Sequence, residues 1–154
     1  MVKRWVLAAV VAGAAVLLAL QAVPCGRAHF NPPVRKEPAW DSPQTRALVA
    51  RACFDCHSNE TTWPWYASVA PMSWLIQRDV EEGRRALNYS EWDRSQKEGA
   101  ESAKSVPKGE MPPWYYTAVQ WKAWLSPAER EALIRGLTAT LGSGDGGRER
   151  GSRD

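Results

Sequence analysis

Residues 53–57 carry two thiols and an imidazole at a spacing that suits one particular chemistry. They read Cys-Phe-Asp-Cys-His, and C-x-x-C-H is the attachment signature of a c-type haem. Two thiols three positions apart can each form a thioether with one haem vinyl group, and the histidine that follows can bind the iron as a fixed axial ligand. The sequence therefore predicts one covalent haem c per chain, attached at Cys53 and Cys56, with His57 as the proximal ligand.

Three other interpretations of the motif compete with haem attachment. A redox-active C-x-x-C pair belongs beside a βαβ pattern, and no such pattern is visible in this chain. A zinc site needs about four ligands, whereas the whole chain holds 3 cysteines and 2 histidines. The third alternative is a chance occurrence in a cysteine-poor chain. Cys25 and His29 lie away from the motif, beside an apolar N-terminal run, and we expect neither to take part in the haem site.

The N-terminal run bears on the compartment, because haem is attached outside the cytoplasm. Lys3 and Arg4 precede 19 uncharged residues, Trp5–Val23. This length is close to the roughly 20 residues that span a bilayer and exceeds the ~7–15 of a signal-peptide core. Basic residues before the run favour an N-terminus inside the cell. A cleavage site after Ala22 would have Leu20 where a small residue is preferred. We therefore favour an uncleaved single-pass anchor in the cell membrane over a removed signal. In either case the remainder lies on the periplasmic or extracellular side.

The composition of the chain after the apolar run indicates one small domain. The chain has 20 Lys and Arg against 17 Asp and Glu, and no basic stripe suggests a nucleic-acid partner. We expect an anchor, or possible signal peptide, at 1–25 and an extended linker at 26–40 that lifts the domain off the membrane. A haem-binding domain at 41–142 and a disordered tail at 143–154 follow. Most of the 9 tryptophans are expected to fill the core, with the wall of a macrocycle pocket as the alternative role.

Helical patterns dominate this domain and no β-strand pattern competes, so the predicted fold class is all-α. Ser42 is a suitable N-cap, with Pro43 at the first helical position. Val49, Cys53 and Cys56 then follow at helical spacing on one face. We therefore expect the haem motif to end this first helix, with both thiols turned toward the element that the helix packs against.

Three further helices are predicted. The second begins at Pro71, after an ordered loop rich in Trp and Pro. The third begins at Ser90, where Ser-Glu-Trp-Asp resembles a capping box, and runs as a polar surface helix through Lys104. The last begins at Ser126, where Ser-Pro-Ala-Glu is a capping box with proline in the first turn, and Gly142 ends it.

Met111 is the predicted sixth ligand of the iron. Of the 3 methionines, Met1 is at the cytoplasmic end, and Met72 begins a helix in register with apolar positions, where methionine usually fills a core. Met111 lies in a loop between helices, and Pro112 and Pro113 restrict the backbone around it. Its thioether would thus be held in place. The alternative is a methionine that only packs against the haem ring.

Six short runs are distinctive enough to compare with known families: residues 37–42 (EPAWDS), 56–61 (CHSNET), 63–66 (WPWY), 70–74 (APMSW), 88–92 (NYSEW) and 111–115 (MPPWY). They resemble the bacterial haem-binding domain family over residues 40–142, and the order of elements resembles small c-type cytochromes. The resemblance implies a membrane-anchored, single-haem, cytochrome-like helical protein in which Cys53 and Cys56 attach the haem and His57 binds the iron. Relatives often carry His-Pro where this chain has Gln and Trp at 120–121, so any role of that histidine is absent here.

Three functions are compatible with one covalent haem. The expected one is electron transfer by a membrane-anchored cytochrome, in which His57 and Met111 saturate the iron and favour a raised reduction potential. A haem-based sensor or ligand-binding module is the alternative, and it needs an open or displaceable sixth site. A peroxidase would want a distal histidine or carboxylate; because His29 lies in the linker, we expect no enzyme. The expected partners are the membrane and a redox protein that the sequence does not identify.

Overall fold

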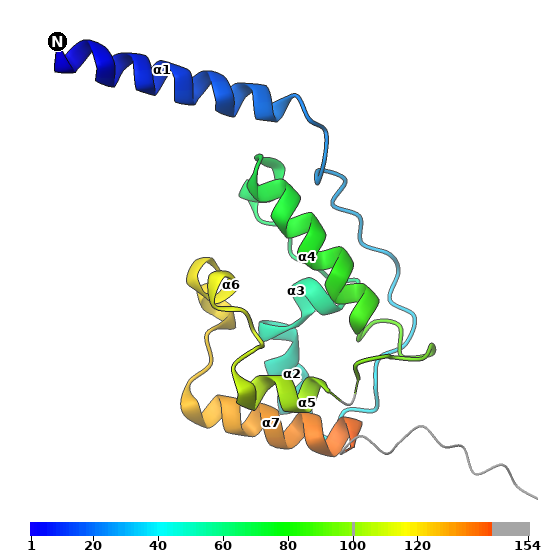
Figure 1. Ribbon diagram of the computed structural model, residues 1–154. Coiled ribbons are helices and arrows are strands. Elements are labelled where there is room, and N and C mark those ends of the chain that lie inside the picture. The colour runs from blue at the N-terminus through cyan, green and yellow to red at the C-terminus, as the bar shows by residue number, and fades with distance from the viewer. Residues whose placement is uncertain (100, 143–154) are drawn as a thin grey trace, which may run out of the picture.

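The computed structural model describes residues 1–99 and 101–142, and every regular element within them is a helix (Figure 1). The predicted all-α class is confirmed. An isolated bridge pairs Lys36 with Glu91. The predicted tail, 143–154, lies outside the described residues. The elements are α1 (Val2–Gln21), α2 (Pro43–Ala52), α3 (Phe54–His57), η1 (Trp65–Ser68), α4 (Met72–Ala86), α5 (Ser102–Lys108), α6 (Trp114–Val119), η2 (Trp121–Ala123) and α7 (Pro127–Leu141).

The start of α2 is as predicted, but its end is not. The Ser42 Oγ accepts a hydrogen bond from the Thr45 N–H at 3.1 Å, and Pro43 is the first helical residue. The helix stops one residue before Cys53, whose φ of −128° separates it from the four-residue turn α3. The Cys53 N–H still donates to the Val49 carbonyl at 2.8 Å. The haem motif therefore follows a kink instead of ending one continuous helix.

Helix α4 lies directly against α3, because a glycine occupies the point of contact. A Cβ added at Gly83 would come within 2.4 Å of the Cys56 carbonyl oxygen, so a larger residue would push the two elements apart. Pro71 is the N-cap of α4, which confirms the predicted start of this helix, and Val80 on its inner face is buried. The close approach brings the carbonyl end of α4 beside the haem motif.

The prediction of a helix beginning at Ser90 is wrong. The chain turns there instead, and α5 begins only at Ser102. Ser90 is fully buried, and its hydroxyl accepts a hydrogen bond from the Asn59 N–H at 2.9 Å. Its carbonyl accepts from the N–H groups of Arg35 and Lys36 at 2.9 and 3.1 Å. Distant segments thus occupy the groups that a helix N-terminus at this position would have used.

Helix α7 closes the domain, and its capping box is confirmed. The Ser126 side chain accepts from the Glu129 N–H, and the Glu129 carboxylate accepts from the Ser126 N–H at 2.9 Å. Leu133 and Leu137 on its inner stripe are buried, and Gly142, with φ 73°, follows its last turn. The main core consists of Leu48, Val49, Phe54, Leu87, Tyr89, Ala103, Val106, Leu133 and Leu137.

The tryptophans do not fill this core, contrary to the expectation. Tyr89, only 1% exposed, is its central aromatic residue, and Trp40 and Trp92 pack beside it with ring centroids at 5.4 and 5.9 Å. An indole is large enough that it is seldom fully buried in a small domain. Trp40, Trp63, Trp74 and Trp92 are half-buried, whereas Trp5, Trp65, Trp114, Trp121 and Trp124 are exposed.

Helix α1 is exposed along its length and meets the domain at its C-terminal end (Figure 1). There the Gln21 amide donates to the Ala70 carbonyl at 3.1 Å, and its oxygen accepts from the Ala70 N–H at 3.0 Å. Residues 26–40 contain no helix, and they do not stand apart from the domain. For example, the Asn59 amide donates to the Pro33 carbonyl at 3.0 Å. The linker therefore lies along the domain's side.

Candidate haem site

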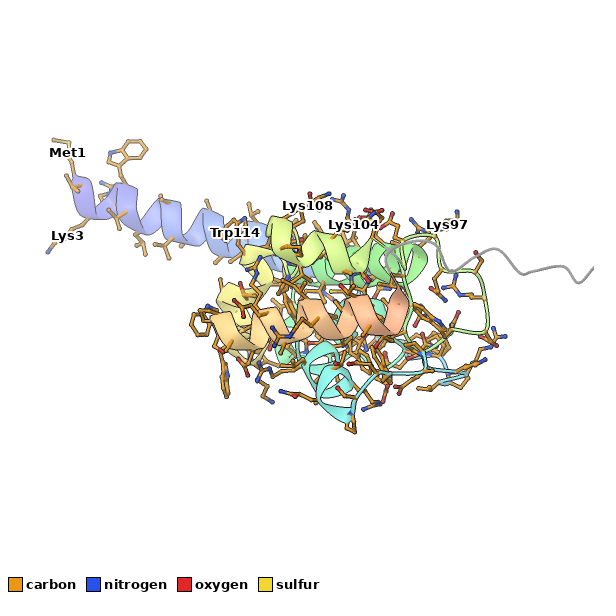
Figure 2. The ribbon with its side chains drawn as sticks, turned by 90° about the horizontal axis from the view of Figure 1, so that it is seen from below. Met1, Lys3, Lys97, Lys104, Lys108 and Trp114 are labelled. Atoms are coloured by element: carbon orange, nitrogen blue, oxygen red, sulfur yellow. The ribbon has the colours of Figure 1, made fainter. Side chains whose placement is uncertain are left out.

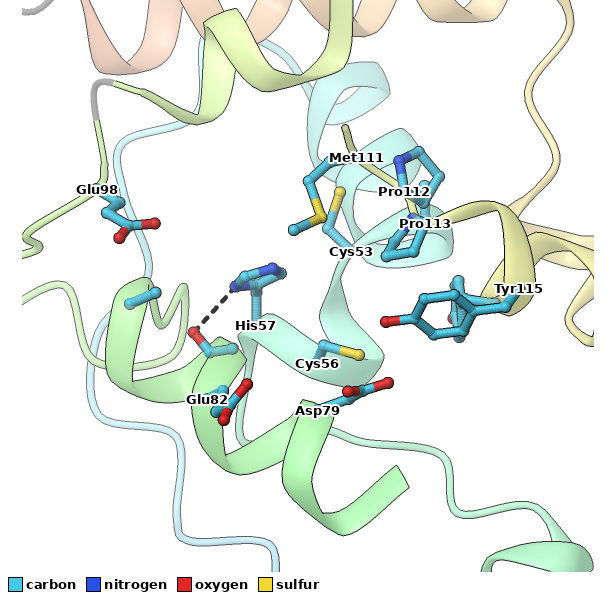
Figure 3. A pocket seen from close by; sticks show the side chains of 14 residues that line it. Cys53, Cys56, His57, Asp79, Glu82, Glu98, Met111, Pro112, Pro113 and Tyr115 are labelled. Carbon is cyan, nitrogen blue, oxygen red and sulfur yellow. Dashed lines mark hydrogen bonds between the residues drawn. The ribbon is translucent and has the colours of Figure 1, made fainter. Parts of the chain in front are cut away.

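The haem motif and the Met-Pro loop line one cavity of about 250 Å³, shown in Figure 3. Cys53, Cys56, His57 and Met111 all contribute to its wall. A second cavity of about 180 Å³ shares Cys53, His57, Glu98 and Met111 with the first. Ligand pockets usually measure about 300–1,000 Å³. The two cavities together reach that range, so the predicted ligands surround a space of suitable size.

Both motif thiols are free, and their surroundings keep them protonated. Burial raises the pKa of Cys53 and of Cys56 to about 12, and the nearby carboxylate of Asp79 adds to the effect at Cys56. Redox-active C-x-x-C pairs have lowered thiol pKa values. This environment therefore argues against a redox dithiol. It favours two reduced thiols, the form from which a thioether is made.

His57 has one ring nitrogen engaged and one left for a ligand. Its Nδ1 lies 3.0 Å from the Gly83 carbonyl oxygen and 3.2 Å from that of Leu87, and Figure 3 marks the first of these bonds. Carbonyl oxygens only accept, so Nδ1 carries the proton and Nε2 keeps its lone pair. Burial lowers the pKa of His57. The imidazole is thus held neutral, which is the form that binds a metal.

A buried polar network holds the backbone around His57. The Tyr89 N–H donates to the His57 carbonyl at 2.8 Å. The Asn88 amide donates to the Asn59 Oδ1 at 2.8 Å, and the Asn59 N–H donates to the Ser90 hydroxyl at 2.9 Å. These two asparagines and Ser90 are at most 3% exposed. Leaving one such group unpaired costs about 1–3 kcal/mol, so the network strongly specifies the position of the histidine.

Arg84 ties the same region to the N-terminal segment. Its guanidinium donates to the carbonyl oxygens of Ser58 at 2.7 Å and Phe30 at 2.9 Å. It also donates to the side chains of Asn31 at 2.8 Å and Thr61 at 2.9 Å. Partial burial lowers the pKa of Arg84. One side chain on α4 therefore joins the loop after the motif to the linker before it.

Met111 reaches the cavity from a loop that is held by fewer polar contacts. Its side chain is 37% exposed, and Figure 3 shows it entering from the side opposite α4. Its N–H donates to the Ser105 carbonyl at 3.4 Å, a long hydrogen bond. Pro112 and Pro113 follow and have no N–H to donate. The thioether is thus available to the cavity while its loop remains partly open to solvent.

Three carboxylates, those of Asp79, Glu82 and Glu98, share the cavity wall with these groups (Figure 3). Burial raises the pKa of Asp79. A fourth carboxylate is engaged nearby, because the Tyr116 hydroxyl donates to the Asp55 Oδ2 at 2.7 Å. The cavity therefore combines soft and neutral donors with negative charge along its wall.

Gly83, Leu87 and Tyr116 shape the site, although the motifs in the sequence do not include them. Gly83 had a local signal, because an isolated glycine within a helical pattern often marks a close approach. Leu87 acts through its backbone carbonyl, which leaves no trace in side-chain patterns. Gln120, at the position where relatives often carry histidine, lies away from the haem cavity, and its amide donates to the Tyr66 hydroxyl at 3.0 Å.

Met72, Cys25 and His29 do not line the haem cavity. Met72 was expected in the core, but it is 36% exposed and lines a separate apolar cavity. Cys25 is exposed. The His29 Nε2 lies 3.0 Å from the Ala67 carbonyl oxygen, and its ring stacks on Trp63 with centroids 4.7 Å apart.

The donor set fits a c-type haem. An imidazole and a methionine thioether are the axial pair of cytochromes c, and both face a cavity that also presents two protonated thiols. Within residues 1–99 and 101–142, no three His, Cys, Asp or Glu side chains are grouped as an ion site would require. The zinc alternative therefore lacks a ligand set in that part of the chain.

Comparison with known proteins supports haem binding. The family model of the haem-binding domain matches residues 15–139, which is most of the chain and includes the motif and Met111. The match begins within α1, earlier than the resemblance from residue 40 onward. No curated protein and no solved structure matches the chain. The chain binds haem and belongs to the haem-binding domain family.

Proposed function

We propose that this protein is an extracytoplasmic, membrane-anchored monohaem c-type cytochrome that transfers electrons. The observation that carries the proposal is the meeting of four groups at one cavity: the thiols of Cys53 and Cys56, the free Nε2 of His57 and the thioether of Met111. Each group is in the chemical form that its role requires.

Each of these four residues has its own proposed role toward the haem. The Cys53 and Cys56 thiols would hold the haem by adding across its two vinyl groups, each sulfur bonding to one carbon and its proton going to the neighbouring carbon, so that no oxidant or reductant would be consumed. His57 would hold the iron through Nε2, and its Nδ1 bonds to α4 keep the ring in one orientation. Met111 would hold the iron through its sulfur. The bound haem would supply an iron that can carry one electron.

A haem-based sensor or ligand-binding module is the second candidate, and one observation favours it. Met111 is 37% exposed, and the hydrogen bond from its N–H is 3.4 Å long. A ligand on so open a loop can be displaced by a small molecule at modest cost. An enzyme is not proposed: His29, the other histidine, is engaged with Ala67 and Trp63.

Membrane anchoring is proposed through α1. This helix is long and apolar enough to cross a bilayer by length and composition, and none of its residues is buried. A signal sequence passes the same test. Lys3 and Arg4 at its start favour an N-terminus inside the cell and a haem domain outside it. The proposed partners are the membrane and a redox protein.

Optical spectra of the purified full chain, recorded in both oxidation states with and without carbon monoxide, test the function. A cytochrome with His57 and Met111 on the iron should show a six-coordinate spectrum that carbon monoxide leaves unchanged. Rapid binding of carbon monoxide to the ferrous protein would reject the saturated electron carrier and select the ligand-binding module.

N-terminal sequencing of the protein extracted from membranes tests the anchor. Retention of α1 gives a sequence that starts at Met1 or Val2. A mature start after Val23 would show that the segment is a removed signal, while the haem domain would still lie outside the cytoplasm.

A further inference from the structure

Four tryptophans of the domain are largely open to solvent. The exposed fractions are 81% for Trp65, 80% for Trp114, 77% for Trp121 and 68% for Trp124. Monomeric proteins seldom expose a large apolar patch unless it binds something. None of the four lines the haem cavity, so the proposed electron-transfer site does not account for them.

These tryptophans belong to two segments of the domain that border one apolar cavity. Trp65 is in η1, and the others are in or beside α6 and η2. The hydrogen bond from the Gln120 amide to the Tyr66 hydroxyl, 3.0 Å long, joins the two segments. An apolar cavity of about 360 Å³, lined by Tyr66, Met72, Trp114 and Val119 among others, lies between them. We call the surface defined by Trp65, Trp114, Trp121 and Trp124 the aromatic face.

The two segments that carry the aromatic face are nearly free of charge, whereas Asp55 and Asp79 line the cavity between them. Residues 61–75 contain no charged side chain and residues 111–125 contain one, Lys122, although 24% of the whole chain is charged. Tryptophan and tyrosine concentrate where a membrane meets water, since their rings are apolar with one polar group. A lysine there can extend its ammonium to the lipid phosphates. Protein partners are commonly selected by complementary charge, and this composition suits a bilayer surface better.

The C-terminal end of α1 is fixed beside this face. Gln21 bonds to both backbone groups of Ala70. At Gly26, which has φ 76°, a Cβ would lie 2.2 Å from the Ser73 carbonyl oxygen, so the chain leaving α1 is pressed against the start of α4. The helix α1 projects to the left of the domain in both views, and α6 in Figure 1 and Trp114 in Figure 2 lie at this left side. A bilayer crossed by α1 would therefore lie on the side of the aromatic face.

We propose that the aromatic face rests in the interfacial layer of the bilayer that α1 spans, with its four indoles among the lipid headgroups and Lys122 at the phosphates. This inference rests on the membrane anchoring in the proposed function. It adds that the domain does not swing freely on residues 26–40. The haem cavity then keeps one orientation relative to the membrane.

Lipid cross-linking of the full chain tests the inference. The haem-loaded protein is placed, one copy per disc, in nanodiscs of phosphatidylcholine and phosphatidylglycerol (3:1) that contain a phosphatidylcholine with a diazirine near its headgroup. After illumination, mass spectrometry locates lipid adducts on the peptides. Adducts are expected on α1 and on peptides covering 63–75 and 113–124, and not on α7.

The fourfold variant Trp65→Gln, Trp114→Gln, Trp121→Gln and Trp124→Gln should lower the adduct yield on those two segments at least fivefold, while the yield on α1 and the haem spectrum stay unchanged. The matched control is Phe30→Gln with Val34→Gln, which removes two exposed apolar side chains elsewhere. It should leave the adduct pattern as it is.

The experiment distinguishes a failure of the docking proposal from a failure of the membrane anchoring. Adducts confined to α1 would overturn the docking of the aromatic face and leave the anchor intact. An absence of adducts on α1 would overturn the anchoring on which the inference depends. Adducts on the face that vanish when two copies share a disc, together with chain-to-chain cross-links through it, would assign the face to a second copy and overturn the lipid assignment.

Discussion

The haem motif and the loop that carries Met111 face the same cavity, but they are held in different ways. On the first side, the His57 Nδ1 bonds to two carbonyls at the end of α4, and Asn59 and Asn88 join the adjoining backbone in a buried network. On the other side, Met111 is 37% exposed, and its N–H makes one long hydrogen bond, to Ser105. One proposed ligand is fixed by buried long-range bonds, and the other lies on a short, partly open loop.

This difference separates two properties of a haem protein. Bonds to the Nδ1 of His57 orient the ring of the proposed proximal ligand, so we expect that side to govern folding and retention of the haem. We expect the loop of Met111 to govern whether the sixth position is closed, because Met111 is the proposed ligand and contributes little to the core. We therefore expect changes near His57 to reduce haem content and stability, and changes near Met111 to alter mainly ligand binding and reduction potential.

The largest effect is expected from removing both attachment thiols. The double variant Cys53→Ala and Cys56→Ala should lose haem when the polypeptide is denatured, whereas the wild type should keep it. Haem staining after denaturing electrophoresis, with acid–organic extraction as a second measurement, gives the answer. Cys25→Ala is the control, because that thiol is exposed and outside the cavity. Quantitative extraction of haem from the wild type would contradict covalent attachment.

A smaller but clear loss is expected on the His57 side from Gly83→Ala. Alanine normally favours a helix over glycine by about 1 kcal/mol, but here its Cβ would lie 2.4 Å from the Cys56 carbonyl oxygen. Separating α3 from α4 should lower the free energy of unfolding by about 1–3 kcal/mol and reduce haem content. Denaturant unfolding of the haem-loaded protein measures the first quantity.

The control is Gly13→Ala in α1, where an added Cβ meets nothing within 4 Å. It should not destabilise the domain. Equal stability of Gly83→Ala and the wild type would show that the contact between α3 and α4 adapts easily, and the proposed contrast between the two sides would fail.

The variant Met111→Ala tests the loop side of the cavity directly. It should open the iron to carbon monoxide and lower the reduction potential. The free energy of unfolding should change by less than about 1 kcal/mol, as is usual for a partly exposed side chain. Met72→Ala is the matched control, because Met72 has a similar exposed fraction, 36%, and does not line the haem cavity. An unchanged spectrum and potential in Met111→Ala would rule out this residue as the sixth ligand.

The smallest effect is expected from neutralising one of the carboxylates on the cavity wall. Carboxylates favour the ferric over the ferrous form, so Glu82→Gln or Glu98→Gln should raise the reduction potential. A unit charge acting across about 10 Å contributes roughly 0.4–1.7 kcal/mol at an effective dielectric constant of roughly 80 to 20. This corresponds to roughly 20–70 mV for one electron. Redox titration measures the shift, and Glu131→Gln, exposed on α7, should give none. A lowered potential would contradict the argument.

N-cap residues in the sequence correctly predicted those helices in which the cap bonds to an N–H of its own first turn. The caps at Ser42 and Ser126 form as expected, because an N-cap bonds to an N–H only two or three residues along the chain. Ser90 has the same kind of signal and begins no helix, because its hydroxyl bonds to Asn59, 31 residues away. A cap can be predicted from sequence only while no distant group competes for it.

The tryptophans show the same limit for burial. Composition alone favoured core positions for them, yet Tyr89 holds the centre of the core and Trp114 and Trp121 face solvent. Hydrophobicity predicts that a side chain gains by leaving water, but it does not say which surface will cover it. That depends on which other elements of the fold pack beside it.

The sequence by itself determined the chemistry that this chain can perform: two thiols and an imidazole at residues 53–57, a methionine before two prolines and an apolar N-terminal helix. These features lie in adjacent residues, and their meaning depends on covalent spacing. The tertiary structure alone decided that Met111 shares a cavity with the motif, that Gly83 and Leu87 engage the Nδ1 of His57, and which tryptophans remain exposed. Each of these depends on residues brought together from distant parts of the chain, and only packing determines which of them meet.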